Sequence, residues 1–163
     1  LSESNYGKAL RQGVKSANYD YLINFSIDFI DIDFLKNALS MISKYDLIIG
    51  SKRIGNGDSR SIYRKIGTIG YNMILNLFIK MPFKDTHGLK LYNTKIAKKY
   101  EKQCVSQSDI FDEELIYRTY KGGHAIKEIG VMVKDIRPAR TSILNRTVKA
   151  IFYLNYLRKN LKD

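Results

Sequence analysis

Three carboxylates follow a short apolar run near the beginning of the chain, and their type and spacing suit the binding of a cation or of a substrate hydroxyl. The run opens at Asp20, is rich in aromatic and β-branched residues, and is followed by Asp28, Asp31 and Asp33. Such a run is typical of a strand covered on both faces in a parallel sheet. Ligands of open α/β sheets lie beyond the carboxyl ends of the strands, so we expect the three side chains where a ligand would be held.

Asp31 and Asp33 also have a structural interpretation. Asp is a preferred N-cap residue, and a helix is expected over residues 34–43, so either side chain could cap that helix instead of binding a ligand. Asp28 ends the apolar run too early to be the cap. It is therefore the strongest candidate for a functional carboxylate.

The chain is strongly basic, with 28 Lys and Arg against 16 Asp and Glu and a net charge of +12. Such a charge predicts an anionic partner, which is a nucleic acid, a phosphorylated substrate or an acidic lipid surface. Basic residues cluster at residues 52–65 and from Arg137 onward, whereas acids gather at residues 28–33 and 109–114. This segregation favours a metal and phosphate site. Nucleic acid is not an expected partner, because the aromatic residues lie within apolar runs and no nucleic-acid motif is present.

The 163 residues favour one domain. The sequence contains neither an apolar run of membrane-spanning length nor the residue order of a signal peptide, so a soluble intracellular protein is expected. Cys104 is the single cysteine, which excludes an internal disulfide framework and a structural zinc site. We expect it to be an inert packing residue.

The elements that must position the candidate residues alternate between strands and helices. Strands are expected over residues 21–27 and 46–49 with the helix of residues 34–43 between them, which indicates βαβ units and a parallel sheet. A long helix is expected over residues 61–79. Its apolar stripe is expected to face inward and consists of Ile62, Ile66, Ile69, Met73 and Leu77.

The second half of the chain continues this alternation. A polar turn at residues 85–88 precedes a short apolar run, helices are expected over residues 94–103 and 110–120, and a last strand over residues 125–134. Asp112 and Glu114 stand at the start of a helix, where the helix dipole favours carboxylates whatever their function. No glycine-rich phosphate loop is present, so composition alone predicts no nucleotide site.

Several segments stand in a distinctive order along the chain: residues 6–13, 20–28, 49–52 with Arg64, 85–90, 111–115 and 128–131. Together they resemble the family 2 glycosyltransferases with a GT-A fold, in particular the dolichol-phosphate mannose and polyprenyl-phosphate sugar synthases. The resemblance covers about residues 5 to 142.

The resemblance implies an α/β fold of the GT-A (Rossmann-like) type, with a mostly parallel sheet that is flanked by helices and lacks the family's first strands. Residues 1–141 would be the C-terminal part of the catalytic domain. The implied reaction moves a sugar, with inversion, from a nucleotide-diphosphate donor to a polyprenyl (dolichol-type) phosphate acceptor. The alternative is a non-catalytic or incomplete relative that binds lipid phosphate or a partner chain.

The resemblance also implies roles for individual residues. Asp28, with Asp31, would hold Mg²⁺ or Mn²⁺, which would neutralise part of the charge on the departing diphosphate. Lys52 and Arg64 would neutralise the rest or bind the acceptor phosphate. His87 would also contact the acceptor phosphate, or would instead stabilise its turn.

The need for a general base depends on the acceptor. A phosphate is already anionic near pH 7 and needs no strong base, whereas a sugar hydroxyl would need Asp85 or Asp112 in that role. Asp28, Asp85 and Asp112 are therefore the candidate catalytic residues.

Two positions depart from the family pattern. Ser26 stands where the family has the first Asp of its Asp-x-Asp motif, which should lower metal affinity unless Asp31 or Asp33 substitutes. Lys52 stands where the family has an arginine. The point charge of its ammonium therefore replaces a guanidinium group that could bind phosphate through two hydrogen bonds.

Residues 142–163 read as a basic amphipathic helix. Such a helix is predicted to lie on an anionic membrane surface, with a helix that covers the sheet as the alternative. A cytoplasmic enzyme, peripheral on the cytoplasmic face of the membrane, is therefore expected. Its partners would be the nucleotide-sugar donor, the lipid acceptor, the membrane and a partner chain or second copy.

Overall fold

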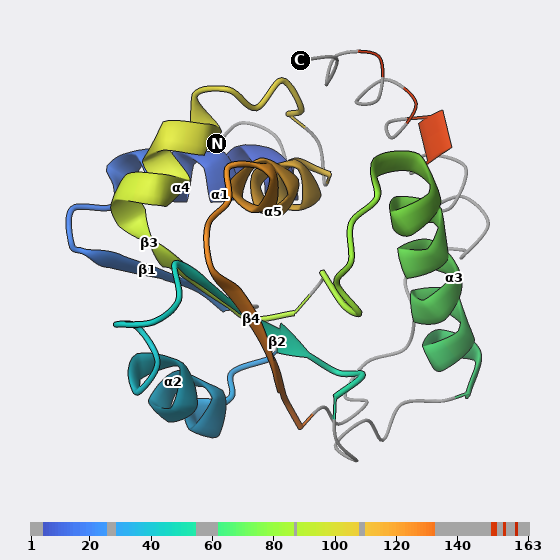
Figure 1. Ribbon diagram of the computed structural model, residues 1–163, viewed down its shortest axis with the longest axis horizontal. Coiled ribbons are helices and arrows are strands. Elements are labelled where there is room, and N and C mark those ends of the chain that lie inside the picture. The colour runs from blue at the N-terminus through green and yellow to red at the C-terminus, as the bar shows by residue number, and fades with distance from the viewer. Residues whose placement is uncertain are drawn as a thin grey trace.

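The computed structural model describes residues 5–25, 29–54, 62–86, 88–107 and 110–132, together with residues 151, 152, 155 and 159. In these residues, four strands form one open sheet that helices flank (Figure 1). The strands are β1 (Tyr21–Asn24), β2 (Leu47–Ser51), β3 (Lys90–Asn93) and β4 (Ile126–Gly130). The helices are α1 (Tyr6–Ser16), α2 (Ile32–Leu39), α3 (Ile62–Ile79), α4 (Thr94–Glu101) and α5 (Phe111–Lys121).

The strands lie in the order β1-β3-β2-β4. β3 is antiparallel to both of its neighbours, whereas β2 and β4 are parallel. Three strands therefore run in one direction and β3 runs in the other. This confirms the predicted α/β fold, although two of the three strand pairings are antiparallel because β3 lies between β1 and β2. One edge of the sheet thus carries the carboxyl ends of β1, β2 and β4 and the first residue of β3. We call it the carboxyl edge.

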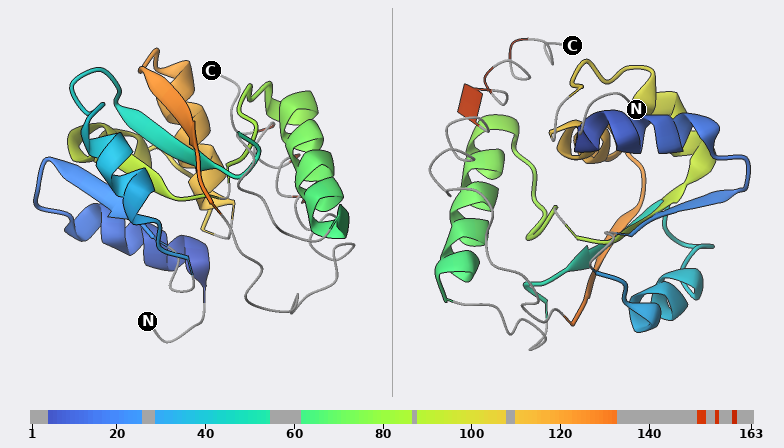
Figure 2. Two further views of the ribbon diagram at one scale, coloured as in Figure 1. Left: turned by 90° about the horizontal axis from the view of Figure 1, so that it is seen from below. Right: turned by 180° about the vertical axis from the view of Figure 1, so that it is seen from behind.

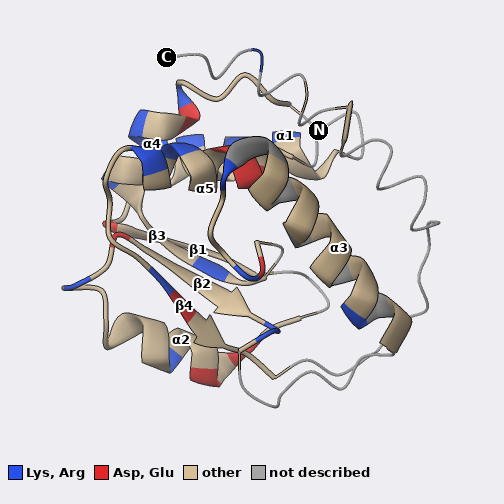
Figure 3. Cartoon of the chain, turned by 45° about the vertical axis from the view of Figure 1, so that its right-hand side comes forward, with Lys and Arg blue, Asp and Glu red and all other residues tan. Residues whose placement is uncertain are grey.

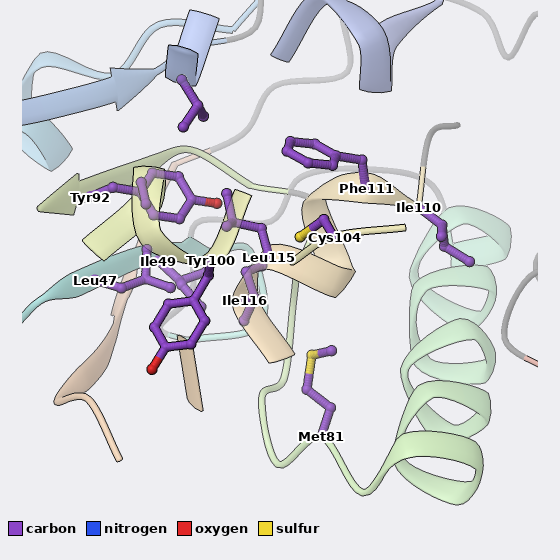
Figure 4. Packing of buried hydrophobic residues seen from close by; sticks show 12 residues of the cluster. Leu47, Ile49, Met81, Tyr92, Tyr100, Cys104, Ile110, Phe111, Leu115 and Ile116 are labelled. Atoms are coloured by element: carbon purple, nitrogen blue, oxygen red, sulfur yellow. The ribbon is translucent and has the colours of Figure 1, made fainter. Parts of the chain in front are cut away.

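Helices cover both faces of the sheet, with α1 and α2 on opposite sides (Figure 2). Strand β2 is buried along its whole length, and its side chains alternate between two cores. Leu47 and Ile49 join the core under α1, α4 and α5 (Figure 4), while Ile48 joins Phe34 of α2 on the other face. Cys104 is buried in the first of these cores, as expected for a packing residue.

Strand β1 is less buried than the sequence predicts. Its composition indicates a strand covered on both faces, but Tyr21 is 36% exposed and the next three residues are only partly buried. The reason is its place at the end of the strand order, because an edge strand has a sheet neighbour on one side only.

The prediction that the apolar stripe of α3 faces inward is wrong. Its members range from 40% exposed at Ile69 to 78% at Leu77. The helix instead packs on the core through Tyr71 and Ile74. The apolar residues of α3 itself occur on all sides of the helix, so their spacing is compatible with more than one buried face. None of the described helices is long and apolar enough to cross a membrane.

Candidate functional site

The carboxyl edge brings together residues that are far apart in the sequence. The strand register places Asn24 of β1 and Ile49 of β2 beside Lys90, the first residue of β3. Ser51, the last residue of β2, lies beside Gly130, the last residue of β4. Residues 84–86 and Gly88, which precede β3, lie at this edge and are here called the turn, and the first turn of α5 also reaches it.

Asp85 and Lys52, both predicted site residues, meet at this edge. The Asp85 carboxylate is fully buried. Its Oδ2 accepts a hydrogen bond of 3.1 Å from the Lys52 backbone N–H and lies 3.4 Å from the Lys52 ammonium. The Lys52 side chain is 12% exposed, so the pair is largely shielded from solvent.

The turn is held from a second direction by Glu128 of β4. The backbone N–H of Lys84 donates to both carboxylate oxygens of Glu128, at 2.9 and 3.1 Å. The backbone N–H of Asp85 donates to Glu128 Oε1 at 3.1 Å. Two successive amides therefore share one carboxylate.

The far end of the turn packs directly on β2. A Cβ added at Gly88 would lie 1.7 Å from the Gly50 carbonyl oxygen, so a side chain has no room there. The Gly50 N–H donates to the Leu89 carbonyl at 2.7 Å. Glycine is required at position 88 because the two backbones approach so closely.

Asp112, another predicted site residue, is the centre of a polar network that is buried except at Tyr6, which is 46% exposed. The fully buried ammonium of Lys90 donates to Asp112 Oδ2 at 2.5 Å and to the Gly88 carbonyl at 2.9 Å. The hydroxyls of Tyr92 and Tyr6 donate to the same carboxylate at 2.9 and 3.3 Å. The network thus links α5, β3 and α1 to the turn.

The charge of Asp112 acts on both tyrosines. Burial and the nearby Asp112 carboxylate raise the pKa of Tyr6 and of Tyr92 above its ordinary value of 10.0. Both hydroxyls therefore stay protonated near neutral pH and serve as donors. Asn24 in turn donates to the Tyr6 oxygen at 3.0 Å.

Glu114 has a structural role. Its carboxylate accepts from the backbone N–H groups of Val105 and Ser106 at 3.0 and 2.8 Å and pairs with Arg118 at 2.8 Å. These contacts fix the loop that leads into α5. They support the structural interpretation of this carboxylate at the start of a helix.

Asp31 caps α2, which confirms the structural interpretation of that residue. Its Oδ1 accepts from the Phe34 N–H at 2.9 Å, and its Oδ2 accepts from the Met132 N–H at 3.2 Å. Within the described ranges, no group of three or more His, Cys, Asp or Glu residues is arranged to hold a metal ion. A metal role for Asp31 therefore competes with this cap and stays a prediction.

The structure does not test the predicted roles of three other site residues. Asp28 and His87 lie outside the described residues, and Arg64 lies in the first turn of α3. Their roles in binding metal or phosphate also stay predictions. The C-terminal helix predicted over residues 142–163 falls almost wholly outside the described residues, although residues 151, 152, 155 and 159 are helical.

No protein-family model matches the sequence. Solved structures of glucosyl-3-phosphoglycerate synthase from Mycobacterium tuberculosis do match the fold. The complex with Mn²⁺, UDP and phosphoglyceric acid has a TM-score of 0.72 and 13% identity, and the match covers 100% of this chain and 57% of that one. The complex with Mn²⁺, UDP-glucose and phosphoglyceric acid has a TM-score of 0.70 and 13% identity, and the match covers 99% of this chain and 57% of that one.

The chain has the GT-A fold. At 13% identity the likeness shows the fold alone, and the chain spans a little over half the length of these structures. Placed in the GT-A fold, Lys52, Asp85 and Asp112 all lie at the carboxyl edge, where ligands of open α/β sheets bind.

Sequence reasoning missed the partners of these residues. Lys90 could have been found, because it is a charged residue inside the apolar run of residues 89–92. Glu128 lies in one of the segments that resemble the family, at residues 128–131, but neither it nor Tyr92 gave a signal of these contacts. Their roles depend on pairings between distant segments.

Proposed function

We propose that this chain is part of a glycosyltransferase that moves a sugar, with inversion, from a nucleotide-diphosphate donor to a polyprenyl phosphate. The GT-A fold supports a nucleotide-sugar donor, because the similar synthase structures hold UDP-glucose or UDP with Mn²⁺. The phosphate acceptor is supported by the residue-level resemblance, by the net charge of +12 and by the state of the two carboxylates at the carboxyl edge.

That state is the observation that carries the proposal. Asp85 is paired with Lys52, and Asp112 with Lys90. A substrate hydroxyl that needed either carboxylate as a general base would have to displace an ammonium or a tyrosine hydroxyl from it. A phosphate oxygen is already ionised and needs no such base, so this site suits a phosphate nucleophile.

Lys52 is the residue of the described site that is best placed to attract the phosphate. Its ammonium lies directly after β2 at the carboxyl edge, with Arg53 next in the chain. We propose that Arg64 and His87 add to this positive charge. A Mg²⁺ or Mn²⁺ ion on Asp28 would supply charge neutralisation for the departing diphosphate.

A lipid-linked acceptor is supported by α3. Its exposed stripe of Ile62, Ile66, Ile69, Met73 and Leu77 is a continuous apolar surface on a basic protein. Apolar helix faces combined with basic charge bind anionic membrane surfaces. We therefore propose that the protein is peripheral on the cytoplasmic face of a membrane, with this stripe in the interface.

The test is calorimetric titration of the chain with farnesyl phosphate, a short soluble polyprenyl phosphate, and with farnesol as the control. Farnesyl phosphate should bind, farnesol should not, and Lys52→Ala should abolish binding while Lys127→Ala on the exposed side of β4 leaves it unchanged. Equal binding of both compounds, or no binding by the folded chain, contradicts the phosphate acceptor.

The donor is tested separately, by titration with UDP-glucose and GDP-mannose with and without Mn²⁺. Metal-dependent binding is expected for an enzyme. Farnesyl phosphate binding without donor binding would instead support the second candidate, a non-catalytic relative that binds lipid phosphate. Ser26 at the Asp-x-Asp position favours this second candidate.

A further inference from the structure

We propose that Glu128 is a positioning residue of the phosphate site, because its carboxylate holds the turn that carries Asp85 and thereby fixes the Lys52 ammonium. This inference rests on the proposed phosphate-binding function. Glu128 itself is placed on β4 and points its carboxylate at backbone amides, so it acts on the ligand only through the turn.

The first step is the contact between Glu128 and the turn. Three hydrogen bonds of 2.9 to 3.1 Å run from the N–H groups of Lys84 and Asp85 to one carboxylate. Successive backbone N–H groups that converge in this way form an anion-binding nest, and hydrogen bonds to a charged acceptor are the stronger kind. Glu128 occupies this nest as a built-in anion.

The second step leads from the turn to Lys52. The Asp85 carboxylate accepts from the Lys52 N–H and pairs with its ammonium. Lys52 follows β2 directly, and Glu128 lies beside Ile49 of β2 in the parallel register. Contacts therefore run from Glu128 of β4 to Asp85 in the turn and from Asp85 to Lys52 at the end of β2. The pairing of β2 with β4 connects the two ends of this series.

The third step shows which end of the turn depends on Glu128. The far end is fixed by Lys90, whose ammonium donates to the Gly88 carbonyl, and by the close approach of Gly88 to Gly50. The near end has the Glu128 contacts at the backbone N–H groups of Lys84 and Asp85, together with a hydrogen bond of 3.3 Å from the Arg53 side chain to the Lys84 carbonyl. Loss of Glu128 should therefore loosen the near end, because three of its hydrogen bonds are lost, while the far end stays in place.

The direction in which phosphate affinity changes when Glu128 is removed distinguishes a positioning role from a purely electrostatic one. Glu128 is an acid close to a site that binds an anion, so its removal by charge alone would strengthen phosphate binding. If Glu128 positions Lys52, its removal weakens binding. We expect Glu128→Ala to lower farnesyl phosphate affinity roughly tenfold, the scale of one lost charged hydrogen bond.

The experiment compares wild type, Glu128→Ala, Glu128→Gln and the neighbouring control Lys127→Ala. Titration with farnesyl phosphate is combined with amide hydrogen exchange at Lys84 and Asp85, measured by NMR. In Glu128→Ala both amides should exchange faster and affinity should fall. Glu128→Gln should recover part of both, because its carbonyl oxygen still accepts, and Lys127→Ala should change neither.

Unchanged or tighter binding by Glu128→Ala, or unchanged exchange at both amides, overturns the inference. A failure of the proposed function looks different, because the wild-type chain would then not bind farnesyl phosphate at all. The exchange measurement still decides whether Glu128 holds the turn in that case.

Discussion

At the scale of single residues, the carboxyl edge is defined by charges that are matched inside the protein. Lys90 is fully buried and lies between the Asp112 carboxylate and the Gly88 carbonyl. A buried ion pair adds little net stability over an apolar pair, but removal of one partner leaves a buried charge uncompensated. The pair therefore acts as a constraint on the geometry of the edge.

We expect Lys90→Met to destabilise the fold by about 3 to 5 kcal/mol, because the Asp112 carboxylate would lose its counter-ion. The measurement is urea unfolding followed by circular dichroism. In the double variant Lys90→Met with Asp112→Asn, no uncompensated charge remains, so part of the loss should be recovered. A single-variant cost below about 1 kcal/mol would show that the pair behaves like a solvent-exposed one.

Two glycines offer a matched pair of alanine substitutions. Gly88→Ala should destabilise the fold by more than about 1 kcal/mol, because the new methyl group would collide with the Gly50 carbonyl. Gly13 lies in α1 with nothing within 4 Å of an added Cβ, so Gly13→Ala should stabilise by about 0.5 to 1 kcal/mol. Thermal unfolding of both variants tests the pair, and opposite signs are required.

At the scale of elements, local sequence patterns predicted the helices well and the strand pairing poorly. Asp31, one of the two capping residues expected from residue type, caps α2, and Asn5 caps α1 in the same way. The reversed direction of β3 could not be predicted, because residues 89–92 read as a short apolar run whatever their partners are. The inward face of α3 was predicted wrongly because apolar residues occur around the whole helix.

The candidate site was predictable to the same limited extent. Lys52, Asp85 and Asp112 were expected from their place in a familiar order of motifs, and the structure brings them to one edge. Their pairing with Lys90, Tyr92 and Glu128 depends on contacts between distant segments, which no local pattern encodes.

The exposed stripe of α3 gives a prediction at this scale. Replacement of Ile66 and Met73 by Lys should reduce binding to vesicles of mixed neutral and anionic phospholipid at least roughly tenfold, since two apolar contacts are lost. Asn37→Lys adds charge on an exposed residue of α2, away from the stripe, and is the control. If the double variant binds the vesicles as tightly as the wild type does, the proposal that the stripe lies in the membrane interface is wrong.

At the scale of the whole molecule, charge and burial set the response to solution conditions. Basic residues line helices such as α4, which carries Lys95, Lys98 and Lys99 (Figure 3). The described acidic residues of the candidate site have partners within the fold instead. At the carboxyl edge Asp85 and Asp112 are each paired with a lysine, and Asp31 caps α2. The outer surface therefore attracts anions.

Stability should fall as the pH rises above about 10, the ordinary pKa of tyrosine. The pKa values of Tyr6 and Tyr92 are raised in the folded chain, so above this pH the unfolded chain releases phenolic protons that the folded chain retains. The free energy of unfolding therefore decreases. Urea unfolding at pH 9, 10 and 11 should show a shallower decrease for Tyr92→Phe than for wild type, and identical slopes would contradict this account.

The pairing of β1 with β3 and of β2 with β4 also has a kinetic consequence. Tyr21 is paired with Asn93, and Leu47 with Ile126, so the sheet joins segments from both halves of the chain. Sheets dominated by such non-local pairs fold slowly, because long loops must close before the pairs form. During synthesis the carboxyl edge can therefore assemble only after Glu128 has left the ribosome, and the turn, Lys52 and Asp85 would acquire their final arrangement in one late step.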